Sequence, residues 1–244
     1  MTRIVVRMTI DEVGHLTPDD CDTIRKSYPP HEIDARTKGL PQLGSGRVFP
    51  VSEEQISIEP FQPPDYWPQI GALDYGYEHP FGAVRIAHDE DNDVAYVIQT
   101  YRQRHATPVI HAAALRAWGE GLPFAWPHDG MSHDKQSGIP LRDAYVREKL
   151  RLLPTHAPMG VEFGIMEMLD RMLTGRLKVF SHLAEWFDEF RLYHRKDGMI
   201  VKKEDDLLAA TRCGIVCLRH ARVFAGRRGP GPEKTEGAYD PAAW

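Results

Sequence analysis

The chain has 244 residues, and its 42% hydrophobic and 27% charged content is ordinary for a soluble globular protein. The formal net charge of −5 argues against binding nucleic acid through bulk positive charge, but it is compatible with local basic patches and a bound cation. No apolar run approaches the ~18 residues that span a bilayer, and the first residues lack a signal-peptide pattern. The three cysteines form no disulfide framework, which suggests a reducing compartment, and we interpret Cys213 and Cys217 as small core residues.

The first 50 residues cannot build a core of their own. They begin with an alternating pattern that predicts a short strand over residues 3–10. Thr17 and Pro18 then form the pattern of an N-cap followed by a proline at the first helical position, which predicts a helix to about Tyr28. The sequence from there to Pro50 is irregular. We interpret this portion as the end of a larger unit or as a linker.

From Trp67 the pattern becomes that of a compact α/β unit. Strands are predicted over residues 69–74, 82–88 and 94–101, and the short links between them favour an antiparallel meander. The elements that follow are helices over 107–118, 140–150, 160–174 and 182–190, and short strands over 124–127, 152–153 and 177–180. The first of these helices carries an apolar stripe, formed by Ile110, Ala113, Ala114 and Ala117.

The last part of the chain contains a hairpin, a helix and a tail. Asp197-Gly198 is the strongest hairpin signal in the sequence and joins the segments 191–196 and 199–203. A helix is predicted from Glu204 toward Val223, and the Gly/Pro-rich residues 225–244 are interpreted as disordered. The order of elements matches a ribonuclease-H-like α/β fold, in which a mixed sheet (an antiparallel meander plus parallel strands) is flanked by helices.

Acidic residues stand at the ends of three predicted elements. Asp74 closes the first strand of the sheet, Asp129 follows the fourth, and Asp205 with Asp206 opens the last helix. If the first and fourth strands are neighbours, these carboxylates meet at one crevice of the sheet. Two carboxylates ~4 Å apart repel by roughly 4 kcal/mol at an effective dielectric constant near 20, and a proton or a divalent cation relieves this. Hard oxygen ligands suit Mg²⁺ or Mn²⁺, and two such ions can together cleave a phosphodiester.

Other interpretations of these residues stay open at the level of sequence. A strand-end Asp near a glycine is often a turn residue, and an acidic pair at a helix start is often a cap that complements the helix dipole. His128-Asp129 with His133-Asp134 could be a His/Asp phosphohydrolase site, but such ligands normally sit on helices, and this segment holds Pro127 and Gly130. The chain has no Gly-rich phosphate loop of a nucleotide motor.

Several basic residues are candidates for contacts with DNA phosphates, although a solvated surface would have the same composition. They lie after the third strand, on a loop beside the predicted cleft, and in the hairpin around Asp197-Gly198, which we expect to guide or gate DNA. The candidates are Arg102, Arg104, Lys135, Arg195, Lys196, Lys202 and Lys203.

The order and spacing of several blocks resemble the C-terminal half of the large terminase subunit of tailed double-stranded-DNA phages. The blocks are Thr9-Ile10-Asp11-Glu12, Ala35-Arg36-Thr37-Lys38-Gly39-Leu40-Pro41, Gly44-Ser45-Gly46-Arg47-Val48-Phe49-Pro50, Leu73-Asp74-Tyr75-Gly76, Trp126-Pro127-His128-Asp129-Gly130 and Asp205-Asp206-Leu207-Leu208-Ala209-Ala210-Thr211-Arg212. The resemblance covers the chain to about Val223. It implies a ribonuclease-H-like endonuclease that cuts concatemeric viral DNA during packaging, at the procapsid in the host cytoplasm.

The resemblance also implies ligands, domains and partners. Two Mg²⁺ or Mn²⁺ ions would be held by Asp74, which bridges both, by Asp129, and by Asp205 with Asp206. Residues 1–46 would be the end of an ATPase domain and a linker, 47–224 the nuclease domain, and 225–244 a tail. The chain would then be a truncated, fragmented or naturally split subunit. The expected partners are double-stranded DNA, the portal protein and the small terminase subunit, with no membrane.

Three alternatives carry different functions. A catalytically idle assembly module would dock on the portal or the small subunit. A junction resolvase or a transposase-like enzyme would share the fold but require branched or end-specific DNA. An actin-like sugar kinase also places an Asp-x-Gly on its first strand, but it needs further glycine-rich phosphate loops, and none is evident.

Overall fold

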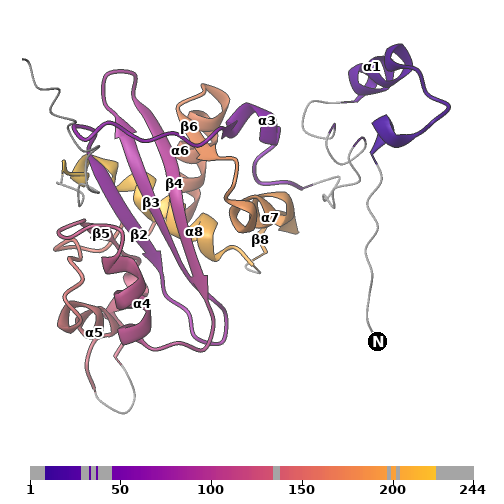
Figure 1. The fold of residues 1–244 in the computed structure, drawn as a ribbon. Helices are drawn as coiled ribbons and strands as arrows, with labels where there is room; N and C mark the ends of the chain where they lie inside the picture. The colour runs from indigo at the N-terminus through magenta and orange to yellow at the C-terminus, as the bar shows by residue number, and fades with distance from the viewer. Residues whose placement is uncertain are drawn as a thin grey trace, which may run out of the picture.

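The computed structural model describes residues 9–28, 33, 37, 46–133, 138–196, 199–201 and 204–223. Its centre is a six-stranded mixed sheet with the strand order β1-β6-β4-β3-β2-β5, covered by helices on both faces (Figure 1). The predicted mixed sheet flanked by helices is therefore present. Among the described helices, none is both long and apolar enough to cross a membrane.

The antiparallel meander forms as the sequence predicts. It consists of β2 (Gln69–Asp74), β3 (Phe81–Asp89) and β4 (Val94–Gln103). The register pairs Asp74 with Gly82, and Gly82 in turn with Arg102. Residues directly opposite in neighbouring antiparallel strands point to the same face, so these three positions form one row across the sheet. The row has a gap at its centre because glycine has no side chain.

Parallel strands complete the sheet on both sides of the meander. β5 (Phe124–Ala125) pairs in parallel with β2, and β6 (Leu177–Phe180) pairs in parallel with β4. β1 (Ser57–Ile58) adds to the outer side of β6. Because β2 and β5 run in the same direction, their carboxyl ends lie at the same edge of the sheet. The prediction that these two strands are neighbours is confirmed.

One face of the sheet carries α8 (Asp206–Val216), against which α6 (Val161–Leu173) and α7 (Ala184–Leu192) pack. Two glycines permit the close approach of α8. A Cβ atom at Gly214 would lie 2.6 Å from Ile86 Cδ1, and one at Gly82 would lie 2.6 Å from the carbonyl oxygen of Asp206. The first residue of α8 therefore sits directly over the gap in the row of Asp74, Gly82 and Arg102.

The opposite face is covered by α4 (Pro108–Arg116) and α5 (Leu141–Arg147), which lie on the near side of the sheet in Figure 1. His111 stacks on Phe81 with ring centroids 4.1 Å apart. The predicted stripe of α4 is wrong as a buried face: Ile110, Ala113 and Ala117 are exposed, and the side chains that face the core are those of His111, Ala112 and Leu115. Aromatic stacking by a histidine outweighs the burial of small alanines.

The portion before the sheet differs from the prediction in two places. Ile10 begins a 3-10 helix, η1 (Ile10–Glu12), and does not end a strand; residues 3–8 lie outside the described part. The segment from Val48 to Ile56, including the short α3 (Glu53–Ile56), is part of the main core, so the unit begins well before Trp67. The predicted first helix is present as α1 (Pro18–Ser27) with Thr17 as its cap.

The remaining elements are shorter than the sequence predicts. The hairpin is reduced to β7 (Arg195–Lys196) and β8 (Met199–Ile200), because 191 and 192 still belong to α7; its turn at 197–198 lies outside the described residues. The strand predicted at 152–153 is a single bridge from Leu152 to Phe124. The strand predicted over 124–127 gives way to η3 (His128–Met131), and α8 ends at Val216, followed by η4 (Leu218–His220). The tail over 225–244 lies outside the described part.

The contact over Gly82 generates a first prediction. Gly82→Ala places a methyl group against the backbone of Asp206, and overpacking of this kind costs about 1–3 kcal/mol. We expect the melting temperature to fall by roughly 2–10 °C, measured by calorimetry. Gly14→Ala is the control, since a Cβ there meets nothing within 4 Å. An unchanged melting temperature in Gly82→Ala would show that α8 does not pack on the sheet as described.

Candidate metal centre

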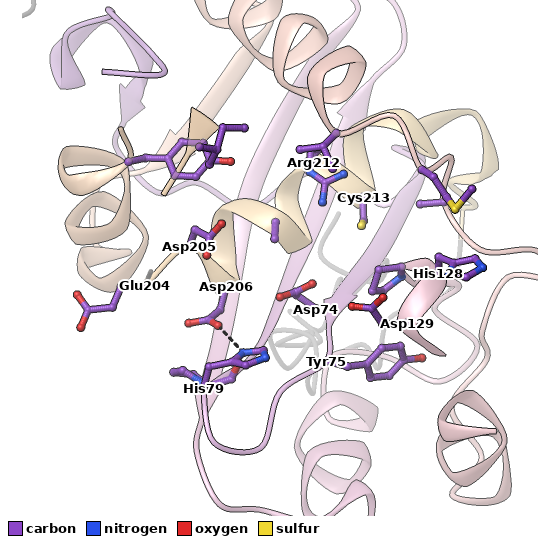
Figure 2. A pocket seen from close by; sticks show the side chains of 18 of the residues that line it. Asp74, Tyr75, His79, His128, Asp129, Glu204, Asp205, Asp206, Arg212 and Cys213 are labelled. Atoms are coloured by element: carbon purple, nitrogen blue, oxygen red, sulfur yellow. Dashed lines mark hydrogen bonds and ion pairs between the residues drawn. The ribbon is translucent and has the colours of Figure 1, made fainter. Parts of the chain in front are cut away.

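A cavity of about 620 Å³ opens where β2 and β5 end and α8 begins (Figure 2). All four predicted acids line it. Asp74 is the last residue of β2, Asp129 belongs to η3 just after β5, Asp205 is the N-cap of α8, and Asp206 is its first residue. Figure 2 shows the carboxylates of Asp74 and Asp129 facing the same space. The structure thus brings together residues that are more than 130 positions apart in the chain.

The electrostatics of the cavity are unfavourable for Asp74. Burial, followed by the charges of Asp206 and Asp205, raises the pKa of Asp74 to about 7, and Arg212 and His79 oppose that rise. Ligand atoms of Asp74, His79 and Asp206 lie within 4.8 Å of one another. A set of carboxylate oxygens that destabilise one another when ionised is chemically suited to a hard divalent cation. The residues present therefore fit the predicted Mg²⁺ or Mn²⁺ ions.

His79 is a member of this cluster that the sequence analysis missed. It lies in the loop between β2 and β3, and its Nδ1 is 3.1 Å from Oδ1 of Asp206. The side chain is 62% exposed, so it stands at the mouth of the cavity. Nothing in its local sequence distinguishes it from an ordinary loop histidine.

Arg102 and Glu189 lie behind the acids. Arg102, predicted as a DNA contact, places its NH2 nitrogen 3.1 Å from Oδ2 of Asp206 and its Nε 3.2 Å from Oε1 of Glu189. Glu189 is 2% exposed. Burial raises its pKa to about 8, against the opposing effects of the Leu208 amide and Arg102. The structure therefore gives Arg102 protein partners within the site, and it adds Glu189, which the sequence analysis did not single out.

Arg212 and Cys213 reach the cavity from the next turns of α8. The stem of Arg212 crosses α6 at Gly164, where a Cβ would lie 2.5 Å from its Cγ. Its charge lowers the pKa of Asp74. Cys213 and Cys217 are free and buried, which confirms their interpretation as core residues.

The other basic candidates are dispersed. Arg104 lines the cavity, Arg195 pairs with the exposed Glu162 at 2.8 Å, and Lys196 is exposed on β7. Lys135, Lys202 and Lys203 lie outside the described residues, as does Asp134 of the alternative His/Asp site. Within the described part of the chain, the cluster of Asp74, His79 and Asp206 is the one group of three potential ligands close enough to hold an ion.

Comparison with known families decides the kinship of the chain. The family described as "Terminase RNaseH-like domain" matches residues 71–217, which include Asp74, Asp129, Asp205 and Asp206. The chain belongs to the terminase RNaseH-like domain family. A second family, the N-terminal part of the T4likevirus-type terminase large subunit, matches residues 1–56. The predicted kinship with large terminase subunits is confirmed.

The similar full-length proteins are large terminase subunits. That of Salmonella phage P22 is 42% identical over 236 residues, covering 94% of this chain and 47% of the relative. That of Enterobacteria phage LP7 is 44% identical over 218 residues, covering 87% of this chain and 46% of the relative. The chain therefore spans about half the length of the curated relatives it matches.

Solved structures show the same fold. The P22 large terminase nuclease domain matches with a TM-score of 0.68 and 42% identity, covering 74% of this chain and 96% of that domain. The large terminase of a thermophilic bacteriophage, in complex with ADP, matches at 0.57 and 16% identity, covering 85% and 53%. The large terminase nuclease of the thermophilic phage G20c with bound magnesium matches at 0.52 and 15%, covering 71% and 98%. The predicted ribonuclease-H-like fold of the terminase nucleases is confirmed.

The raised pKa of Asp74 predicts how stability depends on pH. The folded-state pKa of about 7 lies above the ordinary value of 3.8, so the folded protein retains a proton that the unfolded chain releases. In EDTA, stability should therefore decrease between about pH 4 and pH 7, by at most about 4 kcal/mol from this group. Asp74→Asn removes the effect, and we expect its melting temperature at pH 8 to equal or exceed that of the wild type. Thermal scans across this pH range test the prediction.

Asp65→Asn is the control for this experiment, because Asp65 is exposed. Glu189, whose pKa is also raised, contributes to the slope in every variant. A large loss of stability in Asp74→Asn at pH 8 would instead assign Asp74 a structural role.

Proposed function

We propose that this protein is a metal-dependent DNA endonuclease that cleaves concatemeric viral DNA during genome packaging. The observation that carries the proposal is the convergence of four carboxylates from three chain segments on one cavity, in a chain of the terminase RNaseH-like family. The 42% identity to a domain described as the P22 large terminase nuclease domain supports the same activity.

The acids have distinct roles in this proposal. Asp74, in the middle of the cluster, would bridge two Mg²⁺ or Mn²⁺ ions, Asp129 would hold one, and Asp205 with Asp206 would hold the other. Bound ions would supply an activated water, orientation of the phosphodiester and stabilisation of the leaving oxygen. The carboxylates themselves orient and hold; because the cavity is acidic, DNA would meet net repulsion there without cations.

DNA would reach the cavity past basic side chains on its rim. Arg104 and Arg212 line the cavity. The basic hairpin of β7 and β8, with Lys196 on it, would guide or gate the duplex. Through these local contacts a chain with a net charge of −5 can bind DNA.

The wider setting follows from kinship with the large terminase subunits. We propose that residues 47–224 form the nuclease domain and that residues 1–46 are the end of an ATPase domain with its linker. Double-stranded DNA, the portal protein and the small terminase subunit are the proposed partners. The proposed place of action is the procapsid in the host cytoplasm.

A plasmid-nicking assay tests the activity. Asp74→Asn and Asp129→Ala should each reduce nicking in Mg²⁺ or Mn²⁺ by at least about 100-fold, since each removes a charge that holds an ion, and EDTA should abolish wild-type cleavage. Asp65→Asn is expected to cleave like the wild type. Wild-type protein that does not cleave in either metal would favour the idle assembly module, and cleavage restricted to branched or end-specific DNA would favour a resolvase or transposase-type enzyme.

A further inference from the structure

The N-terminus of α8 is capped by a residue from another helix. The first amide groups of a helix have no partner inside it, and an Asp at the N-cap usually accepts from them. Here the N-cap Asp205 makes no such side-chain bond. Instead Oε2 of Glu189, from α7, accepts the amides of Leu207 at 2.7 Å and Leu208 at 3.1 Å. An acid that would otherwise serve the helix is thereby kept for the cavity.

The second oxygen of Glu189 connects to Asp206 through Arg102. The Nε of Arg102 is 3.2 Å from Oε1 of Glu189, and its NH2 nitrogen is 3.1 Å from Oδ2 of Asp206. The guanidinium is planar and rigid, so it fixes the two carboxylates relative to each other. The other oxygen of Asp206, Oδ1, faces His79. Both oxygens of Asp206 therefore have defined directions before any ion binds.

Burial makes this arrangement stiff. Glu189 is 2% exposed and Asp206 is 4% exposed, so neither carboxylate can exchange its protein partners freely for water. A buried charge that loses its partner is costly, which disfavours rotation of any one side chain out of the network.

We propose that Glu189 is a positioning residue, which caps α8 in place of Asp205 and, through Arg102, orients the Asp206 carboxylate for metal binding. The proposal rests on the proposed function, since it names the support of the same acids. Outer residues of this kind typically change metal affinity by about 10–100-fold when they are altered.

Two substitutions separate the two parts of the role. Glu189→Gln keeps an acceptor for the α8 amides but loses the charge that holds Arg102. We expect Mn²⁺ binding, measured by calorimetry, to weaken by about 10–100-fold, with little change in the circular dichroism spectrum. Arg102→Gln should weaken it to a similar extent. The double variant should be no weaker than the weaker single variant, because both act through one ion pair.

Glu189→Met removes the acceptor at similar length. In metal-free protein, we expect hydrogen exchange of the Leu207 and Leu208 amides to accelerate at least about tenfold, while α6 stays protected. Glu185→Gln is the matched control: Glu185 lies one turn earlier on α7 and is exposed. It should leave Mn²⁺ affinity and amide exchange unchanged.

The outcomes distinguish this inference from the proposed function. Wild-type protein that binds Mn²⁺ beside a Glu189→Gln variant of equal affinity would overturn the positioning role alone. Unchanged amide exchange in Glu189→Met would overturn the capping role. Wild-type protein that binds no Mn²⁺ would contradict the proposed function and the positioning role together.

Discussion

Mutual repulsion between carboxylates is the constraint on which this structure depends. Asp74, Asp129, Asp205 and Asp206 share one cavity, and the pKa of Asp74 rises to about 7 through burial and its acidic neighbours. Such a cluster reduces the stability of the empty fold, so other interactions must compensate for it. The large core on both faces of the sheet provides that reserve, and the site is built at its edge.

Three features bring the acids together despite this repulsion. Parallel pairing of β2 with β5 places Asp74 beside the segment of Asp129. Gly82 leaves a gap in the row between Asp74 and Arg102, and the first residue of α8 sits over it. Arg102 then balances one side of Asp206, while Asp74 lies on the other side without such a partner. The charge imbalance is therefore concentrated where the proposed ions would bind.

The sequence predicts the meander closely because β2, β3 and β4 have strong apolar patterns and short polar links. It also identifies all four acids, since each stands at the end of an element. It fails where long-range packing decides. β1 is two residues long and exists only through pairing with β6. The buried face of α4 follows from stacking of His111 on Phe81, and Glu189 has the local pattern of an exposed helical acid although its partners come from β4 and α8.

The most direct test of the account is a crystal of the protein soaked in Mn²⁺ and measured at the manganese edge. The account predicts two anomalous peaks ~3.5–4 Å apart, with an oxygen of Asp74 within about 2.5 Å of both. Asp129 should contact one peak, and the Asp205–Asp206 pair the other. Anomalous density that avoids Asp74, or its absence from the cavity in Mn²⁺-soaked crystals, would contradict the claim that these acids converge to hold metal ions.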